Sequence, residues 1–562
     1  MKNAPFLLVP VVLAIASSAR AQVPPDAGAL RQQIERNLQP TLPRKSTQDV
    51  QAAPPPLEKL GAETVTVTQF RIAGNHLVDD ATLQLVLAPF KNRPLGFQEL
   101  QRAALAVSQA YRQAGWIARS YLPRQEIDGG VVTIQVVEAS FGGTRVGGSE
   151  PSRVSMERIR ATIEAAQPTG ASLNADALDR AILLVDDLPG VSASGNLAAG
   201  DRDSETVVVL KLEDEPWVAG AVGIDNAGAR STGATEISAD LLAASPFKLG
   251  DSVSLNALHA AGSDYSRLAF SLPVGHTGLR AGISTSLLDY RLVTHDFAAL
   301  DAHGNSSTGG ADLSYPLLRS RFKNLFVTLN YDDKHYDNLA NGTHTSKYSV
   351  DAWTAGLSGN VYDDLGGGGA TNASLSIEQG RVNLAGSPSQ ATDAATVRSA
   401  GSFDKLRYGL SRQQALTDSV ALFGALSGQH ASKNLDSSEK FYLGGASGVR
   451  AYPASEAGGS DGQMLNLELR GRLPANFSAV GFFDWGHVTV NHDNDFTGAA
   501  TVNSYSLKGA GVSVGWISSQ SANVRMTLAR RLGSNPNPNA NGSDQDGTLK
   551  KNRLWLTATL PF

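Results

Sequence analysis

The chain contains no cysteine among its 562 residues. This absence excludes a disulfide scaffold, a zinc–thiolate site, an iron–sulfur cluster and a cysteine nucleophile. Charged residues are also scarce, at 18% against about 25% in an average soluble domain. The net charge of −5 provides no basic surface of the size that nucleic-acid binding requires, so we expect no nucleic-acid partner.

Long hydrophobic runs are missing beyond the N-terminus. After residue 21, no stretch is apolar for the roughly 18 residues that a transmembrane helix needs. The one apolar run, Phe6 to Ala16, follows Lys2 and precedes the small residues Ala19 and Ala21. This pattern is typical of a secretory signal peptide in residues 1–21, although a membrane anchor is the alternative. We therefore expect the mature chain to be exported.

Residues 22–38 are predicted to hold a short helix, because Asp26 can cap it and three apolar side chains recur at helical spacing. These side chains are Leu30, Ile34 and Leu38. A helix of this length is marginal alone and needs a surface on which to dock. Residues 39–64 contain five prolines, which predicts a linker that is partly extended.

Two consecutive segments, residues 65–139 and 140–215, share one predicted order of elements: strand, helix, helix, strand, strand. Two units of one size and one order form an internal repeat. They resemble the POTRA domain, a periplasmic module in which two helices cover one face of a three-stranded sheet. The sequence therefore predicts two α+β periplasmic domains.

Residues 216–562 lack helical periodicity and consist of short stretches in which apolar and polar residues alternate. In one of them, Leu325, Val327 and Leu329 alternate with Thr328 and Asn330. A strand with one apolar and one polar side suits a barrel wall between lipid and water. At roughly 20 to 22 residues per strand and connection, the segment predicts a transmembrane antiparallel β-barrel of about 16 strands. A soluble β-sandwich or β-helix is the alternative.

The last nine residues give the clearest strand. Every even-numbered residue from Leu554 to Phe562 is apolar, including Leu556 and Leu560. A final strand that ends on an aromatic residue resembles the assembly signal that outer-membrane barrels present to their insertion machinery. We therefore expect barrel-assembly machinery, periplasmic chaperones and outer-membrane lipid as partners during biogenesis.

Two motifs precede that strand. A glycine-rich segment, which strand counting places in the sixth of eight extracellular loops, contains Val449, Arg450, Ala451 and Tyr452. A later strand contains Phe482, Asp484 and Gly486. Alternation turns Phe483 and Trp485 toward lipid and Asp484 toward the lumen, because a carboxylate that faces lipid is costly. We expect Arg450 to reach inward and form a bidentate ion pair with Asp484.

Two POTRA-like units, a barrel of about 16 strands and these motifs together resemble the outer-membrane transporters of two-partner secretion, of the haemolysin and adhesin secretion-activation type. That family has a Val-Arg-Gly-Tyr tetrad in a sixth loop that folds into the lumen, and a Phe-x-Asp-x-Gly motif on strand thirteen. Only Ala451 departs from the tetrad, where glycine reaches positive φ more easily. The resemblance implies a plug helix in residues 22–38. It also implies a pore that secretes a large unfolded partner protein with an N-terminal secretion domain.

No catalytic, cofactor or metal site is predicted. Gly511–Gly515 fits the G-x-S-x-G pattern of a serine nucleophile, but it lies inside an alternating strand and no histidine follows it. The acidic stretches at 493–495 and 544–547 lack the ligand spacing of calcium loops, so we expect solvated loops there.

Two other functions are open. A barrel-assembly insertase shares POTRA units and the sixth-loop motif, whereas a passive porin or nutrient receptor leaves the POTRA-like repeat without a role. The partner can equally be an adhesin, a haemolysin, a contact-inhibition toxin or a haem-capture protein.

Overall fold

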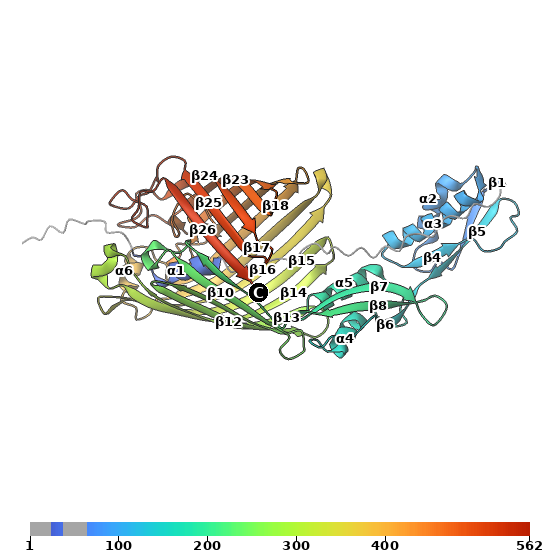
Figure 1. The fold of residues 1–562 in the computed structure, drawn as a ribbon, viewed down its shortest axis with the longest axis horizontal. Coiled ribbons are helices and arrows are strands. Elements are labelled where there is room, and N and C mark those ends of the chain that lie inside the picture. Colours follow the sequence, from blue (N-terminus) through green and yellow to red (C-terminus); the bar gives the residue numbers. More distant parts are fainter. Residues whose placement is uncertain (1–23, 37–63) are drawn as a thin grey trace, which may run out of the picture.

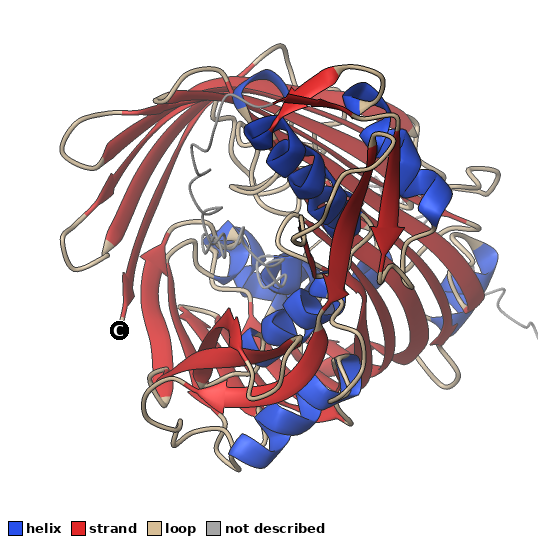
Figure 2. Cartoon of the chain, turned by 90° about the vertical axis from the view of Figure 1, so that its right-hand side faces the viewer, coloured by secondary structure: helices blue, strands red, loops and turns tan. Residues whose placement is uncertain are grey.

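The computed structural model describes residues 24–36 and 64–562. The predicted signal peptide, Leu38 and all but the last residue of the predicted linker lie outside the described residues. Two α+β units, drawn in blue and teal, precede a large barrel drawn in green to red (Figure 1). Figure 2 views the molecule from the side of these units, with the barrel strands behind them. Among the described residues, no helix has the length and apolar character needed to cross a membrane.

The first unit contains a three-stranded sheet of order β2-β5-β4 and a two-stranded ribbon, β1-β3. Its elements are β1 (Thr64–Thr66), β2 (Gln69–Ala73), α2 (Asp80–Leu87), η1 (Ala88–Phe90), β3 (Pro94–Gly96), α3 (Phe97–Gln113), β4 (Ala118–Tyr121) and β5 (Val131–Glu138). Asp79 caps α2 by accepting a hydrogen bond from the Thr82 N–H at 2.8 Å. The predicted order is confirmed. The extra ribbon, only three residue pairs long, is too short to produce a pattern in the sequence.

The second unit repeats the plan with a sheet of order β6-β8-β7. Its elements are β6 (Ser140–Val146), α4 (Met156–Ala166), α5 (Ala175–Asp186), β7 (Val191–Ala199) and β8 (Glu205–Asp214). Backbone hydrogen bonds join the two units, from Ile117 N to Leu173 O at 3.1 Å and from Ala175 N to Gly115 O at 2.8 Å. The two units therefore form one continuous arm.

The remaining residues form a closed antiparallel barrel, and the predicted number of 16 strands is confirmed. The strands are β9 (Val218–Asp225), β10 (Glu236–Ala244), β11 (Ser252–Ala260), β12 (Ser263–Val274), β13 (Leu279–Arg291), β14 (His303–Arg319), β15 (Lys323–Ala340), β16 (Thr343–Asp363), β17 (Gly369–Asn383), β18 (Gly401–Ala415), β19 (Val420–Ala431), β22 (Asp461–Arg472), β23 (Phe477–Thr489), β24 (Ser504–Ile517), β25 (Asn523–Arg531) and β26 (Asn552–Pro561). Strand β26 pairs with β9 and closes the ring.

The barrel wall has an apolar outer face and a polar inner face, as the alternation predicts. On β15, Leu325 and Leu329 are exposed on the outside, whereas Thr328 and Asn330 line the lumen. Leu556, Leu560 and Phe562 at the C-terminus are likewise exposed, and Phe562 exchanges two backbone hydrogen bonds with Gly220 at 2.9 and 3.0 Å. The C-terminal aromatic residue therefore sits at the seam between the last strand and the first.

Short elements occupy the connections and the lumen. They are α1 (Ala27–Arg36), η2 (Arg230–Thr232), η3 (His295–Leu300), η4 (Leu365–Gly367), α6 (Gln390–Ala395), η5 (Ser437–Glu439), β20 (Phe441–Tyr442) and β21 (Gly458–Gly459). Helix α1 lies within the barrel (Figure 1). The end of the predicted helix, at Leu38, lies outside the described residues, and Asp26 caps the helix by accepting from the Ala29 N–H at 2.9 Å.

The second unit docks on the turns at one end of the barrel through ion pairs from α5 and its C-terminal end. The guanidinium of Arg319 donates to both carboxylate oxygens of Asp187 at 2.8 Å. Arg321 donates to Asp179 at 2.7 Å, and Arg180 donates to the Pro316 carbonyl at 2.7 Å. Because the first pair is bidentate, it fixes direction as well as distance.

Candidate functional site

The connection from β19 to β22, residues 432–460 and here called loop 6, folds back into the barrel. Within it, Phe441 and Tyr442 pair with Gly459 and Gly458. Its tip is tightened by hydrogen bonds such as that from Val449 N to Leu443 O at 2.7 Å. The tip packs in one apolar cluster against side chains of β22 to β25. Loop 6 is therefore an ordered part of the lumen.

Arg450 binds two carboxylates on the barrel wall. Its Nε and Nη2 atoms donate to Asp484 at 3.0 and 2.7 Å, and its Nη1 donates to Glu468 at 2.8 Å. Its backbone N–H also donates to Asp484 at 3.0 Å. The guanidinium lies over the Phe482 ring, 3.5 Å from the ring centroid. The structure thus brings Arg450 together with Asp484 in a bidentate pair and with the ring of Phe482.

The pair is nearly dehydrated, because the Asp484 side chain is 0% exposed and that of Arg450 is 13% exposed. Asn466 gives Asp484 a further hydrogen bond at 2.8 Å, and Trp555 on the last strand donates to the Arg450 carbonyl at 2.8 Å. Charged groups removed from water need such complete hydrogen bonding.

Two small residues of the wall make room for loop 6. A Cβ atom at Gly486 would lie 2.7 Å from the Leu443 side chain, and one at Gly509 would lie 2.6 Å from the Cβ of Ala451. Ala451 is fully buried and does not have positive φ. The alanine in place of the family glycine therefore introduces no backbone strain, and its methyl group packs against the wall.

The other members of the tetrad are buried as well. Val449 and Tyr452 are both 0% exposed, and the Tyr452 ring lies under the Arg531 guanidinium at 4.4 Å from its centroid. All four residues of the motif thus lie at the contact between loop 6 and the wall.

Helix α1 lies in the lumen between the wall and loop 6. Its predicted apolar residues Leu30 and Ile34 are 4% and 8% exposed and join a cluster that includes Tyr265, Leu288 and Phe403. Its N-terminus is held where Ala27 N donates to the Asn338 side chain at 3.0 Å.

Helix α1 also touches loop 6 directly. Arg36 donates to the carbonyls of Tyr442 at 2.9 Å and Gly444 at 3.0 Å. Ser455 donates to the Gln33 side chain at 2.9 Å. Displacement of either element would break contacts of the other, so the two are mechanically coupled.

The extracellular connection after β25, residues 532–551 and here called loop 8, covers the other side of loop 6. Glu456 of loop 6 is 0% exposed and accepts from Asn535 at 2.9 Å and from the Gln545 N–H at 2.8 Å. Burial raises the pKa of Glu456 to about 7. The expectation of a solvated loop at 544–547 is wrong, because Asp544 is 0% exposed and pairs with Arg531 and, at 3.2 Å, with Arg553.

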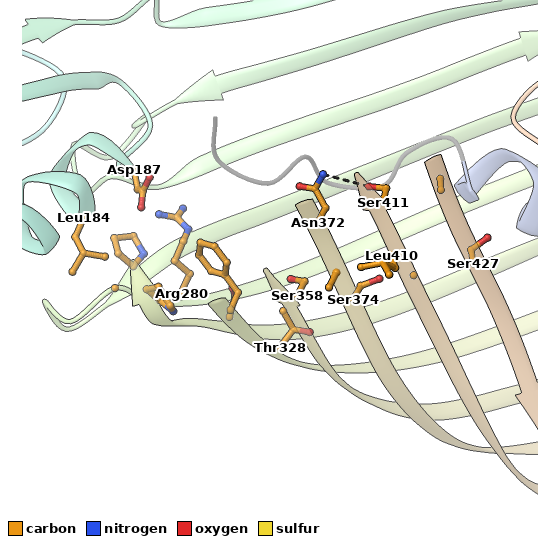
Figure 3. Close-up of a pocket in the computed structure, with 18 of the residues that line it drawn as sticks. Leu184, Asp187, Arg280, Thr328, Ser358, Asn372, Ser374, Leu410, Ser411 and Ser427 are labelled. Carbon is orange, nitrogen blue, oxygen red and sulfur yellow. Dashed lines mark hydrogen bonds between the residues drawn. The ribbon is translucent and has the colours of Figure 1, made fainter. Parts of the chain in front are cut away.

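A cavity of about 690 Å³ lies at the periplasmic mouth, between α5 and the barrel. Leu184 and Leu188 form its outer end, and small polar residues of β15 to β19 form its inner end, among them Ser358 and Ser374. In Figure 3, the Arg280 side chain points toward Asp187 of the second unit.

Sequence reasoning missed three contributors to the site: Glu468, Asn466 and Trp555. The polar residues Asn466 and Glu468 alternate with apolar ones on β22, so that pattern carried a signal. Trp555 is an apolar residue at an odd-numbered, inward-facing position of the last strand. Its partner is the backbone carbonyl of Arg450, and a backbone group cannot be recognised from sequence.

Similarity to known proteins agrees with this geometry. Residues 204–516 match the family described as haemolysin secretion/activation protein ShlB/FhaC/HecB, and residues 65–139 match the ShlB-type POTRA domain. The heme/hemopexin transporter protein HuxB of Haemophilus influenzae is 26% identical over 98% of this chain and 97% of that protein. The outer membrane transporter CdiB of Dickeya dadantii is 25% identical over 81% of both chains.

Among solved structures, CdiB from Escherichia coli matches with a TM-score of 0.73 and 20% identity, covering 96% of this chain and 100% of that one. This likeness establishes the fold of a POTRA arm and a 16-stranded barrel. The chain belongs to the ShlB/FhaC/HecB family of haemolysin secretion/activation proteins, and it is an outer-membrane pore of two-partner secretion.

Proposed function

We propose that the lumen is the path of the secreted partner and that α1 and loop 6 close it at rest. The observation that carries this proposal is that both elements lie inside the barrel and hold each other through Arg36 and Gln33. We infer that the chain acts as a transporter, and we assign no catalytic role to Ser513. Ser513 of the G-x-S-x-G pattern lies on β24, and its hydroxyl bonds to that of Thr527 at 2.8 Å, with no histidine in this contact.

The contacts of α1 suit a removable plug. A helix as short as the described one, Ala27–Arg36, is marginal alone, so leaving the lumen also releases conformational entropy. Polar contacts such as those of Arg36 and Ala27 can be exchanged for water or for an incoming polar chain. These two effects lower the cost of opening, whereas the burial of Leu30 and Ile34 in their apolar cluster holds the plug in place at rest.

We assign a different role to the Arg450–Asp484 pair, which anchors loop 6 to the wall. A dehydrated bidentate pair gives one preferred position and is costly to break from one side. Loop 6 thus has a defined docked state from which a passing chain can displace it. In the docked state, the side chains of Val449, Ala451 and Tyr452 pack in the apolar cluster against the wall. On the wall, the Phe482 ring stacks on Arg450, and Gly486 leaves space for Leu443.

The arm offers the partner its first contact. The outer strands of its sheets are β2 and β4 in the first unit and β6 and β7 in the second. An extended, unfolded segment can add to such an edge and place alternate side chains in a groove beside it. The second unit, which borders the mouth cavity, is the better placed of the two.

The lumen next to the arm suits passage of an unfolded chain. Small uncharged side chains, including Thr328, Ser358, Ser374 and Ser427, line the inner part of the mouth cavity. Such groups bind a moving segment weakly. We infer that folding of the partner outside the cell supplies the driving force.

The domain plan of the chain follows from this role. Residues 1–21 are the signal peptide, 22–38 the plug, 39–64 the linker, 65–139 and 140–215 the POTRA units, and 216–562 the barrel. Barrel-assembly machinery, chaperones and lipid act during biogenesis, with Leu556, Leu560 and Phe562 as the assembly signal.

Two measurements test the proposal. Deleting residues 24–36 should raise single-channel conductance, because it empties part of the lumen; unchanged conductance would contradict the plug. Depleting the full chain from cells should remove one large exported protein from the medium and leave other outer-membrane barrels at normal levels. A general loss of barrels would favour an insertase, and an unchanged medium a passive porin.

A further inference from the structure

Three side chains that the secretion site does not use converge at the extracellular rim of the barrel. They are His430 on β19, Asp461 at the start of β22 and His492 in the connection from β23 to β24, residues 490–503, here called loop 7. The Nδ1 atom of His430 lies 2.8 Å from one Asp461 oxygen, and that of His492 lies 3.0 Å from the other. The two imidazole rings are 5.7 Å apart between centroids.

We propose that His430, Asp461 and His492 form a binding site for a divalent transition-metal ion of the Zn²⁺ class. One ligand atom from each residue lies within 4.8 Å of the others, so a small adjustment surrounds one ion. Zn²⁺ binds imidazole nitrogen and carboxylate oxygen at about 2.0–2.2 Å, and three protein ligands with a water are a known arrangement. Ca²⁺ and Mg²⁺ prefer sets of oxygen ligands and fit less well.

The two histidines are accessible to solvent, and a backbone hydrogen bond orients the aspartate. The side chains of His430 and His492 are 68% and 33% exposed, so an ion reaches them from the medium. Asp461 accepts a hydrogen bond from the Ala431 N–H at 2.9 Å, which orients its carboxylate. Such supporting bonds improve metal sites by fixing their ligands in advance.

Loop 7 is also held in place beside its ligand. Asn434 of loop 6 and the backbone of Asp493 exchange two hydrogen bonds, both of 2.8 Å. Asn491 and Asn503 join the two ends of loop 7 by bonds of 2.9 Å. His492 therefore reaches the cluster from a preformed loop rather than from a free tail.

A bound ion would clip loop 7 to β19 and β22, the two strands from which loop 6 leaves and to which it returns. The bound Zn²⁺ would then restrict motion of the ends of β19 and β22, where loop 6 begins and ends. This inference stands on the three side chains alone and does not depend on how the partner crosses the lumen.

The test uses the full mature chain in detergent, prepared without a polyhistidine tag. Zn²⁺ affinity is measured by competition with a chromophoric chelator, and Co²⁺ supplies a visible spectrum that reports its ligands. We expect one ion per chain, a Co²⁺ spectrum of four-coordinate type, and at least about tenfold weaker affinity in His430→Gln, His492→Gln and Asp461→Asn. His259→Gln is the matched control, because His259 pairs with Asp264 at 2.6 Å and should bind Zn²⁺ as the parent does.

A second measurement tests whether the bound ion attaches loop 7 to the two strands. Zn²⁺ should slow protease cleavage within loop 7 of the parent chain and of His259→Gln, but not of His492→Gln. No saturable Zn²⁺ uptake by the parent chain, or equal uptake by the double variant His430→Gln/His492→Gln, would overturn the proposal. Specific uptake without protection of loop 7 would overturn the clip.

Discussion

Replacing Arg450 by alanine should release loop 6 from the barrel wall. The change removes two charge-assisted hydrogen bonds to Asp484, one to Glu468 and the stacking on Phe482. Breaking a buried pair from one side costs about 3–5 kcal/mol. Asp484 keeps two donors, Asn466 and the backbone N–H at position 450, which places the cost near the lower figure. About 3 kcal/mol corresponds to a roughly hundredfold larger population of released loop.

The cysteine-free chain permits a direct assay of this release. Val449→Cys places a thiol at a fully buried position of loop 6, where labelling requires local opening. The labelling rate should rise roughly a hundredfold when Arg450→Ala is added, in line with the cost above, and secretion should fall while the barrel still inserts. Arg267→Ala is the control, because the side chain of this lumenal arginine lies away from loop 6 and donates one hydrogen bond, to Ser284 on the wall, at 3.3 Å. Equal labelling rates with and without Arg450 would refute the anchoring role.

Three further results are expected. Cysteines at Asp26 and Ser437, whose side chains share a 2.6 Å hydrogen bond, should lock α1 in place when oxidised and stop secretion until a reductant is added; secretion by the cross-linked form would contradict the plug. Because burial raises the pKa of Glu456 from 4.5 to about 7, its contact with loop 8 should be strongest below about pH 4.5 and weaken as the pH rises to about 7. Glu456→Gln should abolish that change in the protease sensitivity of loop 8, and an unchanged pH profile would exclude Glu456 as its source. Asp187→Ala leaves the nearly buried Arg319 without its bidentate partner, at a cost of about 1–2 kcal/mol. Hydrogen exchange should therefore quicken at residues 320–322 and secretion slow, whereas unchanged exchange would show that the pair does not fix the arm.

The barrel could be predicted from the sequence because its cause is local. A strand between lipid and water must alternate at every second residue, and Leu325, Leu329 and Leu556 carry that pattern without reference to the rest of the fold. The Arg450–Asp484 pair could also be inferred, because a lumenal carboxylate on a strand needs a cation and a glycine-rich loop can deliver one.

Contacts between loops could not be predicted, because they produce no periodic pattern in the sequence. Glu456 meets Asn535 across 79 residues, and neither residue lies on an element with a periodic pattern. The burial of Asp544 depends on Arg531 and Arg553 and on the cover of the surrounding loops, which only the folded chain supplies. For the same reason, the cluster of His430, Asp461 and His492 has no recognisable ligand spacing.

One cross-linking measurement tests directly whether the partner passes through the lumen. A photo-activated cross-linker is placed at Asn330, which lines the lumen, or at its neighbour Leu329, which is 41% exposed on the outer face of the same strand. The partner is the exported protein that co-purifies with the full chain, arrested in transit by a fused, disulfide-locked domain. Cross-links from Asn330 and none from Leu329 are the predicted result. Cross-links from Leu329, or none from Asn330 to an arrested partner, would contradict translocation through the barrel.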